Sequence, residues 1–174
     1  IHIIGATRSG TTYLELLISS LKNVECFDEP PMLRVLLPLI NRLSKEEFKI
    51  LFEAYLFEER LMFSLPGRNI NTNKKDQTSI YNSKTKYEIS KRLNKSYRRL
   101  EIFPMALKST IAFKQVEVGH YLDKLIDYYP KFRTILIIRK PEGVVSSILE
   151  KRWFSNHQLK QNSGKWFFKK GKTW

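Results

Sequence analysis

The chain has 174 residues, of which 42% are hydrophobic and 13% aromatic, enough for one folded domain with a buried core. This composition excludes a chain that is disordered as a whole. The formal charge of +14 favours an anionic partner: a nucleic acid, a membrane surface or a polyanionic small molecule. No apolar stretch approaches the roughly 20 residues that cross a bilayer, so we expect no membrane span.

The cysteine content bears on the compartment. Cys26 is the single cysteine and cannot form an intramolecular disulfide, which suits a reducing compartment. We therefore expect a cytoplasmic protein. The chain begins at Ile1, inside an apolar run, so we also expect that N-terminal material has been removed. If that material included an anchor, the alternative location is the Golgi lumen.

The N-terminal 14 residues, IHIIGATRSGTTYL, contain an apolar run, a loop bracketed by Gly5 and Gly10, and an apolar-periodic stretch. This order predicts a strand, a phosphate-binding loop and a helix, because glycines let backbone N–H groups approach an anion. An ordinary nucleotide-binding loop has lysine after the second glycine. Here Thr11 stands at that position and Arg8 is the only cation in the loop, which argues against an ordinary ATPase or GTPase.

A second strand is predicted at 24–27, after a helix that runs from the loop to about Lys22. This strand delivers Asp28 and Glu29 to its carboxyl end, where open α/β sheets place their ligands. The alternative is that both acidic residues begin the next helix as favourable N-terminal charges.

The middle of the chain is mainly helical in pattern. Residues 32–43 are apolar with a kink expected at Pro38, and residues 44–47 form a capping box for a second long helix. Phe48 and its apolar neighbours in that helix are predicted to lie in the core or to form an acceptor-pocket wall. Residues 66–83 are polar without a period and predict a loop that is mobile or acts as a lid.

The next segments alternate between helix and strand. Residues 84–100 predict a basic helix whose charged face is solvated or contacts an anion, and residues 102–107 predict a strand that ends at Lys108. A helix follows at about 116–129. Residues 133–139 form an almost continuous apolar run, typical of a strand inside a parallel sheet, before a helix at 142–151.

This alternation predicts an α/β fold, a P-loop-like three-layer sandwich with a central parallel sheet flanked by helices. The last segment, residues 151–174, combines seven lysines or arginines with aromatic residues and contains no acidic residue. Such a segment can stack on the bases of a nucleic acid strand. Alternatively, it folds over a single nucleotide.

Two separated motifs carry a resemblance to a known family. Residues 5–14 (GATRSGTTYL) and 138–147 (IRKPEGVVSS) each lie at a predicted strand-to-helix junction. Together they resemble the sulfotransferases that use 3'-phosphoadenosine 5'-phosphosulfate (PAPS). The resemblance spans residue 1 to about 153 and implies one domain over 1–174 that lacks some N- and C-terminal elements. It implies 5'-phosphosulfate binding by Arg8, Ser9, Gly10, Thr11 and Thr12, and 3'-phosphate binding by Arg139 and Ser147.

The chemistry of sulfonyl transfer assigns further roles. Arg8 and the loop hydroxyls can stabilise charge on the leaving phosphate, with PAPS as co-substrate and without a metal ion. Lys108, at the end of its predicted strand, can reach the bridging oxygen; the alternative is a lysine that faces solvent.

The proton acceptor is where the chain departs from part of the family. In cytosolic small-molecule sulfotransferases a histidine lies two residues after the strand-end lysine, and here Thr110 stands there. The segment 24–29 is similar to the tyrosyl-protein branch, in which a glutamate follows the second strand. We therefore predict Glu29 as the base and Asp28 as its neighbour or a helix cap. Three histidines are alternatives: His2 and His120, both expected to be structural, and His157.

Two other functions stay open at this point. One is a kinase-like P-loop phosphotransferase, and the other is a basic nucleic-acid-binding module that uses residues 84–99 and the tail. The family resemblance instead implies a nucleotide co-substrate and a hydroxyl-bearing or phenolic acceptor as partners, with no nucleic acid. It also leaves a homodimer open.

Overall fold

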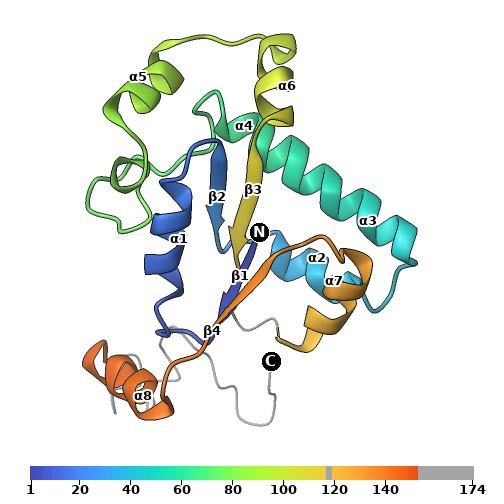
Figure 1. Ribbon diagram of the computed structural model, residues 1–174, viewed down its shortest axis with the longest axis vertical. Helices are drawn as coiled ribbons and strands as arrows, with labels where there is room; N and C mark the ends of the chain where they lie inside the picture. Colours follow the sequence, from blue (N-terminus) through green and yellow to red (C-terminus); the bar gives the residue numbers. More distant parts are fainter. Residues whose placement is uncertain (117–118, 153–174) are drawn as a thin grey trace, which may run out of the picture.

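A computed structural model describes residues 1–116 and 119–152, which form an α/β fold around a parallel sheet (Figure 1). The sheet has four strands in the order β2-β3-β1-β4. In register, Ile3 of β1 pairs with Lys114 of β3 and Ile135 of β4, and Cys26 of β2 pairs with Ala112 of β3. The strands are β1 (His2–Gly5), β2 (Val24–Asp28), β3 (Thr110–Lys114) and β4 (Thr134–Ile137).

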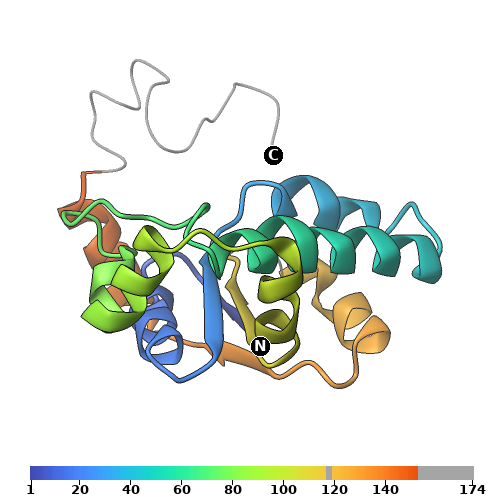
Figure 2. The same ribbon diagram turned by 90° about the horizontal axis from the view of Figure 1, so that it is seen from above.

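Helices cover both faces of this sheet, so the molecule has three layers (Figure 2). One face carries α1 (Thr11–Ser19), α5 (Lys86–Asn94) and α8 (Pro141–Glu150). The other carries α2 (Leu33–Leu39), α3 (Lys45–Ala54), α6 (Arg99–Leu107) and α7 (Leu122–Tyr128). The other helical segments are η1 (Tyr55–Leu61), α4 (Met62–Ser64), η2 (Ile80–Asn82) and η3 (Gly119–Tyr121). This arrangement confirms the predicted three-layer α/β sandwich.

Alternation along the strands divides the core in two. Side chains of successive strand residues point to opposite faces. Ile3 of β1 and Ala112 of β3 pack with Ile18 on the α1 side. Their neighbours Ile4 and Phe113 pack on the other side, in a larger cluster that includes Leu33, Leu37, Phe48 and Phe52. Phe48 and Phe52 are therefore core residues.

One predicted strand is wrong. Residues 102–107 lie in α6, and the strand follows it as β3, Thr110–Lys114. β3 pairs with both β1 and β2. A strand paired on both sides needs each backbone N–H, and Pro104 has none to donate. The run from Ile111 to Phe113 carries no proline and fills this central place.

The position of β4 also differs from the prediction. β4 lies at an edge of the four-stranded sheet and leaves Leu136 half exposed, whereas the apolar run predicted an interior strand. Two predicted helices are shorter: 84–100 divides into α5 and the start of α6, and 116–129 contains η3 and α7. The predicted capping box at Ser44 and Glu47 is confirmed. Among the described helices, none has both the length and the apolar character to cross a membrane.

Candidate functional site

The carboxyl ends of the four parallel strands meet at one edge of the sheet, where they border a cleft of about 850 Å³. We call it the strand-end cleft. One wall comes from the loop between β1 and α1 and from the residues that follow β2, β3 and β4. The facing wall comes from the segment 73–78, in the predicted polar loop. The residues that line the strand-end cleft include Arg8, Gly10, Thr11, Thr12, Asp28, Glu29, Arg34, Lys114, Val116 and Arg139.

The loop between β1 and α1 is tight. The N–H of Ser9 donates to the carbonyl of Ala6 (3.1 Å), and Arg8 and Gly10 adopt left-handed φ angles of 63° and 106°. A Cβ on Gly5 would lie 2.7 Å from Oγ of Ser9 and 2.9 Å from the Ile137 carbonyl, so only glycine fits there. No side chain caps the N-terminus of α1. The helix therefore leaves first-turn backbone N–H groups and its positive dipole end without a side-chain cap, an arrangement that suits an anion.

The second motif, residues 138–147, contacts this loop, although about 130 residues separate the two in sequence. Nε of Arg8 donates to Oγ of Ser147 (3.1 Å), and Nη1 of Arg139 donates to the carbonyl of Arg8 (2.9 Å). Arg139 follows β4, and Ser147 lies in the second turn of α8. Gly143 makes room for Arg139, because a Cβ there would lie 2.9 Å from Nε of Arg139. The fold thus brings together the residues predicted for the two ends of a nucleotide.

Lys108 does not reach this cleft. It is exposed at the end of α6, before β3 begins. Lys108 therefore lies at the amino ends of the strands, whereas the cleft lies at their carboxyl ends. The lysine that ends β3 is Lys114, whose side chain is only 3% exposed. Its Nζ donates to Oγ1 of Thr12 (3.0 Å). Sequence reasoning missed Lys114 because it placed the strand one segment too early. Two residues after Lys114 stands Val116, so a histidine is absent from this place too.

Glu29 and Asp28 lie beside Lys114. Nζ of Lys114 is 3.4 Å from Oε1 of Glu29 and also contacts Oδ1 of Asp28. The N–H of Glu29 donates to the carbonyl of Lys114 (3.0 Å), and Glu29 has a φ of 37°, a left-handed conformation that non-glycine residues rarely adopt. Nη2 of Arg34 holds the other carboxylate oxygen at 3.3 Å. Backbone strain of this kind is characteristic of functional sites.

A third carboxylate, Glu15 of α1, faces Lys114 from within the protein. Its Oε2 lies 3.5 Å from Nζ, and the residue is 5% exposed. Burial and the neighbouring Asp28 raise the pKa of Glu15 to about 8, although Lys114 acts in the opposite direction. Glu15 is another residue that sequence reasoning missed. Its spacing from Thr11 and Ile18, at i−4 and i+3 on the buried face of α1, is the signal that could have found it.

Lys114 stays cationic in this surrounding. Burial alone would lower the pKa of Lys114, but the hydrogen bond and charge of Asp28, with the charges of Glu15 and Glu29, outweigh it and raise the pKa. Lys114 is therefore suited to electrostatic stabilisation rather than to proton abstraction.

Among the described residues, His2, His120 and Cys26 do not line the strand-end cleft. His2 is buried at the amino end of β1, where it stacks on Phe113 (4.6 Å between centroids), and burial lowers the pKa of His2 to about 4. His120 is exposed on η3 rather than in an α-helix. His157 and residues 153–174 lie outside the described residues. Burial raises the pKa of the Cys26 thiol, so it stays protonated and is a poor nucleophile.

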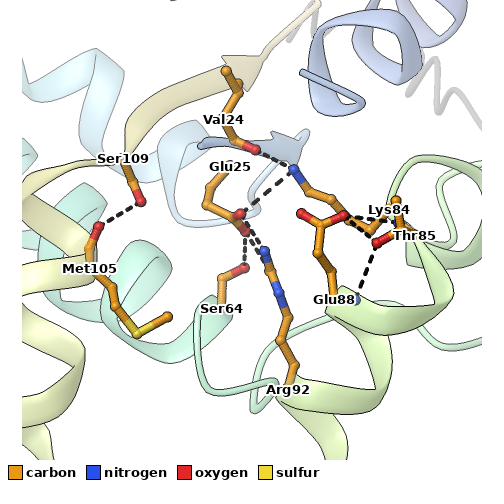
Figure 3. Close-up of polar contacts among 9 residues, drawn as sticks. All are labelled: Val24, Glu25, Ser64, Lys84, Thr85, Glu88, Arg92, Met105 and Ser109. Atoms are coloured by element: carbon orange, nitrogen blue, oxygen red, sulfur yellow. Dashed lines mark hydrogen bonds and ion pairs between the residues drawn. The ribbon is translucent and has the colours of Figure 1, made fainter. Parts of the chain in front are cut away.

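A buried ionic network surrounds Glu25 of β2 (Figure 3). Arg92 of α5 forms two hydrogen bonds to Glu25 of β2 (2.6 and 2.7 Å), Ser64 donates a third (2.8 Å), and Nζ of Lys84 lies 3.7 Å away. Burial would raise the pKa of Glu25, but Arg92, Lys84 and Ser64 outweigh it and lower the pKa. Two cations of the predicted solvated basic face thus point inward. They border a second cavity of about 370 Å³, which we call the rear cavity, together with Glu15 and Asp28.

Comparison with known proteins identifies the family. No curated protein and no solved structure matches the chain significantly. A family model described as the sulfotransferase family matches residues 1–169, which is nearly the whole chain and includes both motifs of the cleft. The chain belongs to the sulfotransferase family.

Proposed function

We propose that this protein transfers a sulfonyl group from PAPS to an acceptor hydroxyl or phenol. The observation that carries the proposal is the pair of hydrogen bonds from Arg8 to Ser147 and from Arg139 to the Arg8 carbonyl. They join two anion-binding motifs into one cradle, and Lys114 and Glu29 lie at its open side.

The residues present fit a nucleotide with an anionic group at each end. The uncapped N-terminus of α1 and the glycine-lined loop suit one anionic group, because their N–H groups need acceptors. Arg139 and Ser147 suit the other. Membership of the sulfotransferase family supports a sulfonate donor, and PAPS has this arrangement of charges.

Different side chains of the cleft bind the leaving phosphate and accept the proton of the acceptor. When bound, PAPS supplies the sulfonyl group and a phosphate that leaves as the bond between bridging oxygen and sulfur breaks. Lys114, in place of Lys108, stabilises the negative charge that develops on that phosphate, together with Arg8 and the hydroxyl of Thr12. Glu29 accepts the proton of the acceptor hydroxyl as the new oxygen–sulfur bond forms.

Ligand-dependent stability tests the proposed donor. Adenosine 3',5'-bisphosphate should raise the melting temperature of the protein more than ATP with magnesium does, because a ligand that binds only the folded state stabilises it by mass action. A response to ATP alone, with magnesium-dependent hydrolysis, would support a phosphotransferase instead. Stabilisation by an oligonucleotide alone, lost steeply with added salt, would support the nucleic-acid-binding module.

Replacement of Glu29 tests the proposed base. We expect Glu29→Gln to lower kcat for sulfate transfer by about 100-fold or more, since general base catalysis contributes about 10²–10⁴. The dissociation constant for adenosine 3',5'-bisphosphate should change less than about threefold. The assay uses radiolabelled PAPS with panels of phenols and alcohols, and Glu46→Gln, on the exposed first turn of α3, is the control. Unchanged kcat in Glu29→Gln would remove Glu29 from this role.

A further inference from the structure

The charges around Lys114 do not balance if every carboxylate is ionised. One buried ammonium faces Glu15 at 3.5 Å and Glu29 at 3.4 Å, and it also contacts Asp28. Three ionised carboxylates against Lys114 and Arg34, which pairs with Glu29, would leave one negative charge in surplus beside the loop that has to bind an anionic donor. Such surplus is costly at Glu15, which is 5% exposed, whereas the side chains of Asp28 and Glu29 are 32% and 30% exposed.

Glu15 is the carboxyl that lacks a cation of its own. Glu29 forms a second ion pair, with Arg34, and Asp28 makes the closest contact with Lys114. Among the described residues, Glu15 has only Lys114 within ion-pair distance, and its buried Oε2 accepts no conventional hydrogen bond. The charge of Asp28 also acts on Glu15 and, together with burial, disfavours a second ionised carboxylate there. The proton therefore belongs on Glu15, consistent with its raised pKa of about 8.

We propose that Glu15 is a positioning residue for the donor: its neutral carboxyl, 3.5 Å from Nζ of Lys114, leaves the charge of Lys114 available to the donor's phosphates, and ionised Glu15 weakens donor binding. This inference rests on the proposed donor site. Glu15 acts through Lys114, which in turn contacts Thr12 of the phosphate-binding loop. The coupling is electrostatic and so grows in a buried, low-dielectric place.

The surroundings of Glu15 allow it to exchange its proton. It borders the rear cavity, whose lining includes Ser19, Ser64, Asn69 and Thr78, so polar side chains that can exchange a proton lie beside it. The groups that face Glu15 directly are Asp28 and Cys26 of β2 and Lys114 of β3. Across the rear cavity lie Glu25, Arg60, Lys84 and Arg92, of which all but Arg60 belong to one network.

The test is the pH dependence of binding of adenosine 3',5'-bisphosphate, measured calorimetrically from pH 6.5 to 9.5. Near pH 6.5, wild type and Glu15→Gln should bind within about twofold of each other, because glutamine resembles the neutral acid. Towards pH 9.5 the dissociation constant of the wild type should rise several-fold more than that of Glu15→Gln. Glu46→Gln, which removes an exposed carboxylate of α3, should follow the wild type.

A linkage measurement gives an independent readout. If ionised Glu15 opposes binding, the ligand raises the pKa of Glu15, and the wild type takes up a fraction of a proton on binding at a pH slightly above its pKa of about 8. Titrations in two buffers of different ionisation enthalpy measure this uptake, which Glu15→Gln should lose. Parallel pH profiles and equal proton uptake would overturn the role of Glu15 and leave the donor site intact. Absence of binding at every pH, in both proteins, would overturn the proposed function as well.

Discussion

At the scale of single residues, two lysines of similar local sequence have different surroundings. Lys108 is exposed at the end of a helix, whereas Lys114 is buried beside Thr12 and two carboxylates of the cleft. Both follow a short apolar run, so their difference in exposure depends on which run enters the sheet.

Paired substitutions of the two lysines test this assignment. Lys114→Gln should lower kcat for sulfate transfer by about 100-fold or more, as loss of one charge-stabilising group typically does. Lys108→Gln should stay within about twofold of the wild type. Steady-state kinetics measure the difference, and circular dichroism shows whether Lys114→Gln remains folded. Comparable losses in the two variants would exclude a special role for Lys114.

At the scale of the element, the start of α8 combines a helix N-terminus with space for a guanidinium group. Gly143 lies in the first turn of α8, and the side chain of Arg139 occupies the volume that a Cβ would fill. Glycine is a poor helix former, and alanine would favour the helix by up to about 1 kcal/mol. Its presence here therefore favours the position of Arg139 over the stability of the helix.

Gly143→Ala should separate stability from binding. We expect a melting temperature equal to or above that of the wild type, and a dissociation constant for adenosine 3',5'-bisphosphate about five- to tenfold higher because Arg139 is displaced. Ser146→Ala, in the same helix at an exposed position, is the matched control. Melting curves and calorimetric titrations measure the two properties. Unaltered affinity in Gly143→Ala would mean that Arg139 relaxes freely or does not bind the ligand.

At the scale of the whole molecule, the network of Glu25 joins α5 and the end of α4 to the edge strand β2. Arg92 and Glu25 are 67 residues apart and nearly buried. The segment that connects α4 to α5 includes residues 73–78, which form one wall of the strand-end cleft. The network thus links the attachment of that segment to the sheet that positions Asp28 and Glu29.

Removal of one partner should destabilise the fold strongly. Arg92→Met leaves Glu25 buried with one cation fewer, and such losses cost about 3–5 kcal/mol of unfolding free energy. The double variant Glu25→Met with Arg92→Met should recover much of that loss, because it leaves no carboxylate without its guanidinium. Urea denaturation measures both, with Lys91→Met on the exposed face of α5 as control. Additive losses in the double variant would show that the pair is not coupled.

The sequence by itself determined the class of fold and the strand, glycine-bracketed loop and helix at its N-terminus, and the family resemblance pointed to the second motif at Arg139 and Ser147. The fold class and the loop depend on local patterns: glycines at the loop, an apolar period of two or of about 3.6, and a capping box. The same local reasoning placed Asp28 and Glu29 at the end of β2, where the structure has them.

Only the tertiary structure decided which lysine reaches the cleft, that β4 lies at an edge, and that Glu15 and Arg92 are buried. Apolar runs of four to six residues fit a helix, an edge strand or a central strand equally well, so pairing with β1 and β2 selected β3 over residues 102–107. The burial of a charged side chain depends on the partner that faces it. Those partners, Lys114 for Glu15 and Glu25 for Arg92, are distant in sequence and meet only when the sheet forms.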